Sequence, residues 1–318
     1  MRFVARFAVW MVCGCGLAFA QQGTKAPPVA AKTQVAAQAG APVPGVPIVA
    51  TPAMWRIKGV HGTVYFFGSV HVMKPNVVWE TAKVKAALAS SDLLYLEIAD
   101  IDNTASAQAI MLQSGMDALH PLSSKISKDD VALLDAAAKS MGLPGEATFE
   151  MMQPWLASAM LSIVPMVKAG YDPTSGIDMK LLAEMKAAQK PVKGFETMTQ
   201  QMHMLSDVPE AEQVEMLHKD LIELNKSTAD TDALVDAWQH GDVETIGRID
   251  NDELARKYPV EYKRIVVDRN QRWVATLDAL LKDPQTGTVF VAVGAAHLAG
   301  PDSVLKMLEK DGWKAERQ

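Results

Sequence analysis

Two apolar segments, one near each end of the chain, run into the same short pattern. Residues 63–67 are followed by Gly68-Ser-Val-His71, and residues 288–293 are followed by Gly294-Ala-Ala-His297. Each apolar run has the length of a β-strand, the glycine permits a sharp turn, and the histidine lies just beyond that turn. We therefore expect a histidine beyond the end of each of these two strands.

Strand-length and helix-length segments alternate at both ends of the chain, with a helical block between them. The expected strands are 54–58, 63–67, 92–98, 190–195, 288–293 and 313–316, and the turn 59–62 joins the first two into a hairpin. The expected helices are 75–90, 154–169, 176–189, 209–224, 230–240, 258–282 and 301–310, with a helical region over 105–142 in which Ser127 is an N-cap. This order predicts an α/β fold, with a mixed, largely parallel sheet flanked by helices and a helical insertion.

Two further predicted strands end in a carboxylate. Glu97 follows Leu93–Leu96, and Glu196 follows Val192–Phe195. In an open parallel sheet, ligands bind beyond the carboxyl ends of the strands, so the two glutamates and the two histidines would converge there. Imidazole and carboxylate together suit a divalent metal such as zinc, manganese or cobalt.

Each of these residues also has an ordinary structural interpretation. The two Gly-x-x-His patterns are compatible with tight turns whose histidines bind backbone carbonyls. Glu97 is compatible with a strand-end cap or an ion-pair partner, and Glu196 with a structural role. Arg269, Asn270 and Trp273 lie on one predicted helix, where they either pack and form a salt bridge or contact an anion in the crevice.

The first 20 residues have the pattern of a secretory signal peptide. Two arginines precede an apolar core, and Ala18-Phe-Ala20 forms a cleavage site. The alternative is a lipoprotein signal in which Cys15 is the lipid acceptor. It ranks second, because a cysteine two places before the acceptor, here Cys13, is unusual. Residues 21–52 contain six prolines, no acidic residue and no apolar periodicity, which predicts a disordered tether. We therefore expect a periplasmic or secreted protein.

Charge and cysteine positions exclude several partners and sites. Beyond residue 52, 27 Lys and Arg face 37 Asp and Glu, and such a surface repels nucleic acid and acidic lipid. No apolar stretch beyond the N-terminus reaches the roughly 20 residues that span a bilayer, which predicts no transmembrane anchor. Both cysteines fall within the first 20 residues, so the mature chain would have no zinc ribbon, dithiol site or disulfide.

The chain resembles the TraB/GumN family, to which the Tiki metalloproteases and the pheromone-shutdown proteins are related. The resemblance covers almost the whole of one domain, 53–318. It is carried by Met54-Trp-Arg56, Tyr65–His71, Leu94–Glu97, Pro154-Trp155, Gly170–Pro173, Gly176-Ile-Asp178, Lys190–Thr197, Gln201, Arg269-Asn270 with Trp273, and Val293–Gly300. It implies a Tiki-like α/β fold related to the erythromycin-esterase and haem-binding ChaN groups. In the Tiki branch it also implies metal-dependent peptide cleavage with manganese or cobalt. Ser69 stands where the family often has Thr, and Phe195 where Leu is common.

The residues and the resemblance together predict an exported metal-dependent hydrolase, in particular a peptidase, acting on a peptide or small-molecule substrate. His71, Glu97 and His297 are the expected metal ligands. Glu97, Glu196 and Arg269 are the expected catalytic residues. Glu97 would help to activate the metal-bound water, Glu196 would act as a base or support, and Arg269 would steady a substrate carboxylate or an oxyanion. The alternatives are a module that sequesters a ligand without turnover, and an accessory factor in surface polysaccharide export, which only the GumN name suggests. The sequence predicts no oligomeric state.

Overall fold

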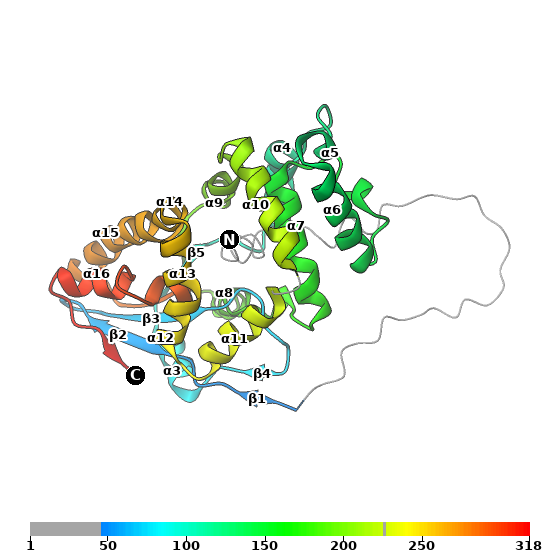
Figure 1. Ribbon diagram of the computed structural model, residues 1–318. Coiled ribbons are helices and arrows are strands. Elements are labelled where there is room, and N and C mark those ends of the chain that lie inside the picture. The colour runs from blue at the N-terminus through cyan, green and yellow to red at the C-terminus, as the bar shows by residue number, and fades with distance from the viewer. Residues whose placement is uncertain (1–45, 225–226) are drawn as a thin grey trace.

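The computed structural model describes residues 46–224 and 227–318, and a six-stranded sheet lies at its centre (Figure 1). Across the sheet, the strand order is β6 (Val192–Glu196), β5 (Leu93–Ile98), β7 (Thr288–Gly294), β3 (Thr63–Ser69), β2 (Met54–Lys58) and β8 (Glu316–Arg317). The first four strands run parallel, whereas β2 is antiparallel to both of its neighbours. The predicted mixed, largely parallel α/β sheet is therefore confirmed.

The two strands that precede the Gly-x-x-His patterns are neighbours in this sheet. β3 and β7 pair in register from Thr63 opposite Thr288 to Ser69 opposite Gly294. β5 pairs with the other side of β7, and β6 pairs with β5. Because all four strands run in the same direction, the residues at their carboxyl ends lie along one edge of the sheet.

Helices cover both faces of the sheet, and the alternating side chains of β7 belong to two separate cores. Residues 289, 291 and 293 pack with α15 (Asp268–Lys282) and α16 (Val304–Lys310). Residues 290 and 292 pack with α3 (Ala82–Ser90) and α8 (Ile177–Ala187). The sheet edge is thus held between rigid layers.

The predicted helical block lies between β5 and β7 in the chain. Its members are α4 (Thr104–Gly115), α5 (Leu122–Lys125), α6 (Lys128–Ser140), α7 (Pro154–Lys168), α9 (Met198–Ser206), α10 (Glu210–Glu223), α11 (Ser227–Gln239), α12 (Val243–Ile246), α13 (Glu253–Lys257) and α14 (Pro259–Tyr262), with π-helical turns at η4 (Gly247–Asp252) and η5 (Lys263–Val267). α6, α7 and α10 enclose a core of their own, far from α16 in Figure 1. Ser127 caps α6 as predicted.

Two helices begin later than their apolar patterns predict. The helix expected over 75–90 begins only after Thr81, whose side chain caps it, and Val77–Val78 instead form β4. The helix expected over 301–310 likewise begins after its cap, Ser303. In both cases a hydroxyl that accepts a backbone N–H, rather than the apolar period, decides where the helix starts.

The end of the predicted tether packs against the fold. The expected signal peptide (1–20) and residues 21–45 lie outside the described residues. In the part that is described, β1 (Ile48–Val49) pairs in parallel with β4, Ala50 is buried, and the N–H of Thr51 donates to the carbonyl of Gln239 over 2.7 Å. The structure thus corrects the tether prediction over 46–52, because β4 offers backbone partners that a Pro-rich composition does not reveal.

Removing residues 46–52 is expected to destabilise the protein. Loss of the β1 pairing and of the buried Ala50 should remove about 2 kcal/mol of stability. At about 2–4 °C for each kcal/mol, a chain that starts at Ala53 should melt about 5 °C below one that starts at Val46. Thermal unfolding of the two chains checks this result, and equal melting temperatures would contradict the packing of this segment.

Candidate functional site

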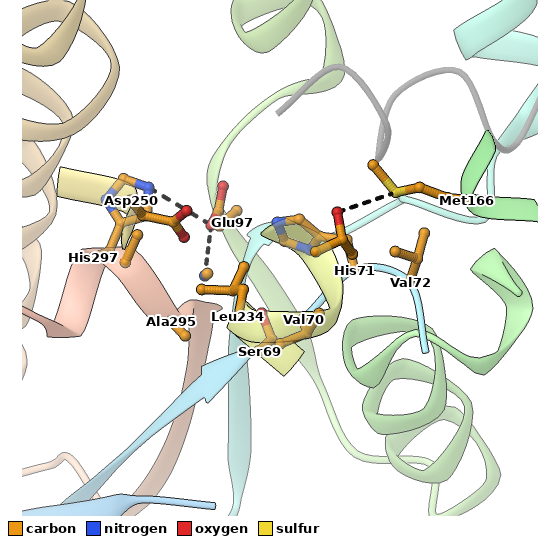
Figure 2. A pocket seen from close by; sticks show the side chains of 13 residues that line it. Ser69, Val70, His71, Val72, Glu97, Met166, Leu234, Asp250, Ala295 and His297 are labelled. Carbon is orange, nitrogen blue, oxygen red and sulfur yellow. Dashed lines mark hydrogen bonds and ion pairs between the residues drawn. The ribbon is translucent and has the colours of Figure 1, made fainter. Parts of the chain in front are cut away.

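Three of the four predicted strand-end residues meet around one point at the sheet edge. A Cβ built on Gly294 would lie 3.1 Å from Glu97 Oε1, 3.5 Å from His71 Nε2 and 3.6 Å from His297 Cδ2. Figure 2 shows Glu97 between the two histidines. The convergence that the parallel strand ends predicted is therefore present, and Gly294 leaves the space that the three side chains share.

Arg269 binds both glutamates from the first turns of α15 and is fully buried. Its Nε donates to both carboxylate oxygens of Glu196 at 3.0 Å. Its Nη2 donates to Glu196 Oε2 at 2.7 Å and to Glu97 Oε2. The guanidinium also lies 4.6 Å from the Trp273 ring centre. Of the two interpretations of Arg269, the salt bridge is observed, and a contact to substrate stays a prediction.

Glu97 is held in its ionised form. Burial by itself would raise the pKa of this carboxyl, but the charge of Arg269, with help from the two histidines and the Gly294 N–H, holds the pKa of Glu97 well below its usual range. Gly294 N donates to Glu97 Oε1 at 2.8 Å, and Gln201 Nε2 donates to Glu97 Oε2 at 3.0 Å and to Glu196 Oε2 at 2.9 Å. Glu97 thus presents a fixed negative charge rather than a proton acceptor at neutral pH.

His297 is a neutral imidazole whose two nitrogens both have protein partners. Its Nε2 lies 3.0 Å from Arg269 Nη1. Because a guanidinium only donates hydrogen bonds, Nε2 must accept this one. The proton therefore sits on Nδ1, which donates to Asn270 Oδ1 at 2.6 Å. Burial and the neighbouring guanidinium lower the pKa of His297 to about 3.

This neutral histidine should make the protein acid-sensitive. The pKa of an unfolded histidine is about 6.5, so between pH 6.5 and 3 the unfolded chain binds a proton that the folded chain excludes. The unfolding free energy should then fall with falling pH, by up to about 1.4 kcal/mol for each pH unit. Urea unfolding from pH 6.5 to 4.5 should show this slope in the native chain, a flatter one in His297→Gln, and an unchanged one in the exposed-site control His240→Gln. A slope that survives His297→Gln would rule out this residue as its cause.

His71 is oriented by a carboxylate from another helix. Its Nδ1 lies 2.8 Å from Oδ2 of Asp178, a buried residue in the first turn of α8. Burial opposes the charged form of His71, but the carboxylates of Asp178 and Glu97 outweigh it and raise the pKa of His71. Gly176 permits this arrangement, since a Cβ on it would lie 2.2 Å from the carbonyl oxygen of His71. His71 Nε2 lies beside the space at Gly294, 3.5 Å from where a Cβ on that residue would be.

Asp178, Gln201 and Asn270 are the partners whose roles the sequence analysis missed. Each lies in a segment quoted for the family resemblance, and Asn270 was noted beside Arg269, but no local pattern paired any of them with a histidine or a glutamate. The one local signal was Gly176, two residues before Asp178, because a glycine at a helix start permits a close backbone approach.

A pocket opens directly over the convergence point. It holds about 660 Å³ of empty space, including open solvent at its mouth. Its walls are mainly apolar, and its lining is Ser69, Val70, His71, Val72, Glu97, Met166, Thr231, Leu234, Asp250, Gly294, Ala295, Ala296 and His297. The pocket therefore combines an apolar cavity with a few convergent polar groups.

The buried side chains at this site carry excess negative charge. Glu97, Glu196, Asp178 and Asp250 are buried acids, and Arg269 is the buried base among them. Their formal charge with a protonated His71 is −2, and it is −3 with a neutral one. Glu196 also pairs with the exposed Arg272, and the negative charge around Glu97 and Asp178 has the sign that attracts a cation.

The described residues, 46–224 and 227–318, contain no group of three His, Cys, Asp or Glu side chains already arranged to hold a metal ion. His297 Nε2 is instead hydrogen-bonded to Arg269. Within the same residues, no helix is both long and apolar enough to cross a membrane.

The fold and the site define an α/β protein with a buried cluster of histidine, glutamate and arginine at the carboxyl edge of its sheet. The model of the TraB/PrgY/gumN family matches residues 53–317, and the chain belongs to this family. An uncharacterized protein of Treponema pallidum (strain Nichols) is 26% identical over 276 residues, 80% of each chain. The uncharacterized protein YbaP of Escherichia coli (strain K12) is 24% identical over 244 residues, 77% of this chain and 87% of YbaP. No solved structure matches the chain significantly.

Proposed function

We propose that the protein is an exported hydrolase that cleaves peptide bonds in this pocket with the help of a divalent cation, manganese, cobalt or zinc. The observation that carries the proposal is the meeting of His71, Glu97 and His297 within 3.6 Å of one point. The excess negative charge around that point supports a cation there, and the apolar walls support a substrate that is mainly uncharged.

Two donor atoms at the site suit a divalent cation. His71 Nε2 faces the pocket while Asp178 holds Nδ1, the arrangement common among metal-binding histidines. Glu97 Oε1 faces the same space and is ionised. His297 would become a third ligand only by exchanging its bond to Arg269 for the cation. When bound, a divalent cation polarises a carbonyl oxygen and lowers the pKa of bound water.

The surrounding residues have separate tasks in this proposal. Glu97 supplies fixed negative charge and, because its pKa is low, is a weak proton acceptor. Arg269 and Gln201 hold the two glutamates in place. Glu196 lies behind Arg269 rather than among the residues that line the pocket, so we assign it to positioning.

Metal analysis combined with peptide turnover tests the proposal. The purified mature chain should contain a divalent metal and cleave members of a peptide library, and a chelator should stop cleavage until the metal is restored. His71→Ala and Glu97→Gln should lose at least about tenfold in metal affinity, while the exposed-histidine control His240→Ala should match the native chain. Turnover that persists in chelator, or metal binding that survives His71→Ala, would overturn the proposal.

A second candidate is a module that sequesters a peptide or small ligand without cleaving it. The bond between Arg269 and His297 favours it, because the site as described holds no ready three-residue ligand set. Ligand binding without turnover, with the metal restored, would select this candidate. The accessory role in surface polysaccharide export has no observation at the site in its favour.

Export itself is tested at the N-terminus. If the signal peptide is cleaved after Ala20, N-terminal sequencing of the exported protein should begin at Gln21. Diacylglycerol attached to Cys15 would contradict this result and support the lipoprotein alternative.

A further inference from the structure

One hydroxyl in the pocket has no partner. Ser69 ends β3 and is 2% exposed, and its Oγ makes no hydrogen bond with any described residue. A buried hydroxyl without a partner destabilises a fold, and most buried polar side chains are therefore satisfied. Ser69 thus carries a hydrogen-bonding capacity that no described residue uses.

The position of Ser69 gives this hydroxyl a use. Ser69 lies opposite Gly294 in the β3–β7 register and lines the same pocket as His71, Glu97 and His297 (Figure 2). A ligand that reaches the convergence point therefore passes within the cavity that Ser69 lines. The unused hydroxyl and the polar cluster belong to one cavity.

The charges in the pocket decide what Ser69 would bind. Glu97 lines the cavity as a carboxylate, and it repels an anionic ligand group. A hydroxyl is a neutral group that can donate, so a ligand oxygen can accept from Ser69 Oγ. A carbonyl oxygen has the required chemistry, whereas a ligand carboxylate would add to the excess negative charge.

The pocket walls decide what lies beside that carbonyl. Val70, Val72, Met166 and Leu234 line the cavity together with two alanines. No Lys or Arg is among the residues that line it, and His71 already pairs with Asp178, so the walls offer an anionic substituent little positive charge. Burial of an uncharged apolar group against these side chains is favourable.

We propose that the pocket binds an uncharged acyl compound, an amide or an ester with an apolar substituent, and that the Ser69 hydroxyl donates to its carbonyl oxygen. The proposal names the substrate class of the proposed hydrolase and, as to cleavage, rests on that function. The hydrogen bond and the apolar preference concern binding alone, and they can be measured without turnover.

The test uses N-acetyl-leucine amide as the probe and N-acetyl-aspartate amide as its charged counterpart. Binding to the mature chain is titrated by ligand-observed NMR in the presence of a chelator, so that no result depends on the cation or on cleavage. The leucine probe should bind at least about tenfold more tightly than the aspartate probe. Ser69→Ala should weaken the leucine probe by about 3–10-fold, the worth of one hydrogen bond, and Ser69→Thr should retain the affinity.

Thermal melting supplies a second readout and a matched control. Because its hydroxyl has no partner, Ser69→Ala should melt at or above the native temperature. Ser91 is also buried, but its Oγ donates to the Ala87 carbonyl at 2.7 Å, so Ser91→Ala should melt lower and bind the probe as the native chain does.

Several results would overturn the inference. These are a leucine probe that does not bind, equal affinity for the two probes, unchanged affinity in Ser69→Ala, or a melting temperature that falls in Ser69→Ala as it does in Ser91→Ala. The last result would mean that the hydroxyl serves the fold. Probe binding that depends on Ser69, without cleavage of any peptide when the metal is restored, would leave the inference standing and defeat the proposed hydrolase.

Discussion

Replacing Arg269 with methionine is expected to lower the free energy of unfolding by about 3–5 kcal/mol. Arg269 is 0% exposed and pairs with Glu97 and Glu196, both buried. Methionine fills much of the volume but leaves the two buried carboxylates without the guanidinium that they share, and only the exposed Arg272 remains beside Glu196. The loss therefore comes from stranded buried charge rather than from a cavity.

Urea unfolding at pH 7 measures this loss, and the neighbouring arginine provides the control. Arg272 lies 3.4 Å from Glu196, but its side chain is 57% exposed, so Arg272→Ala should change stability by less than about 1 kcal/mol. Adding Glu97→Gln and Glu196→Gln to Arg269→Met should recover part of the loss, because it removes the stranded charges. If Arg269→Met and Arg272→Ala lose equal stability, the buried pairing does not matter in the way we describe.

Replacing Gly294 with alanine is expected to disable the site while sparing the fold. Gly294 has φ −47° and ψ 133°, a conformation that alanine adopts easily. The added Cβ would press on Glu97 Oε1 at 3.1 Å and face His71 Nε2 at 3.5 Å. Arg269 and Gln201 hold Glu97 in place, so the carboxylate cannot move far from the added Cβ. The Cβ therefore occupies part of the space that a ligand would use. We expect the proposed hydrolysis to fall by about 100-fold.

Manganese titration followed by electron paramagnetic resonance, beside thermal melting, measures the two effects separately. Gly294→Ala should bind manganese at least about tenfold more weakly and melt close to the native chain. Gly142→Ala is the reverse control: its φ is +81° and a Cβ there meets no atom within 4 Å, so it should lose about 1 kcal/mol of stability with unchanged manganese binding. Native-like manganese binding in Gly294→Ala would refute the shared space at this glycine.

Local sequence patterns predicted the strands that carry the site. Apolar runs of strand length and the turns after Gly68 and Gly294 mark β3 and β7, and the carboxylate after another apolar run marks the end of β5. The residues that form each of these signals lie close together in the chain. Each signal can therefore be recognised without knowledge of the rest of the sequence. Because parallel strands end at one edge, the meeting of His71, Glu97 and His297 followed from the strand pattern.

Two local features of the chain differ from their predictions. The helix expected over 75–90 starts only after Thr81, and residues 46–52 pair with β4 although their composition suggests a tether. In the first case a cap was present in the sequence and overlooked. In the second, the partner strand was an expected helix, so no pairing could be predicted.

Only the tertiary structure decided what each side chain at the site does. Asp178 and His71 are 107 positions apart in the chain, and Arg269 and Glu97 are 172 positions apart. Those partners depend on how α8 and α15 pack on opposite faces of the sheet. The sequence by itself determined which residues stand at the strand ends, since an apolar run and the turn residues after it lie close together in the chain. The tertiary structure decided that His297 is neutral and hydrogen-bonded to Arg269 and that Ser69 has no partner in the part of the chain that the structure describes. Burial, pKa and hydrogen-bond partners arise only when distant helices pack over the sheet edge.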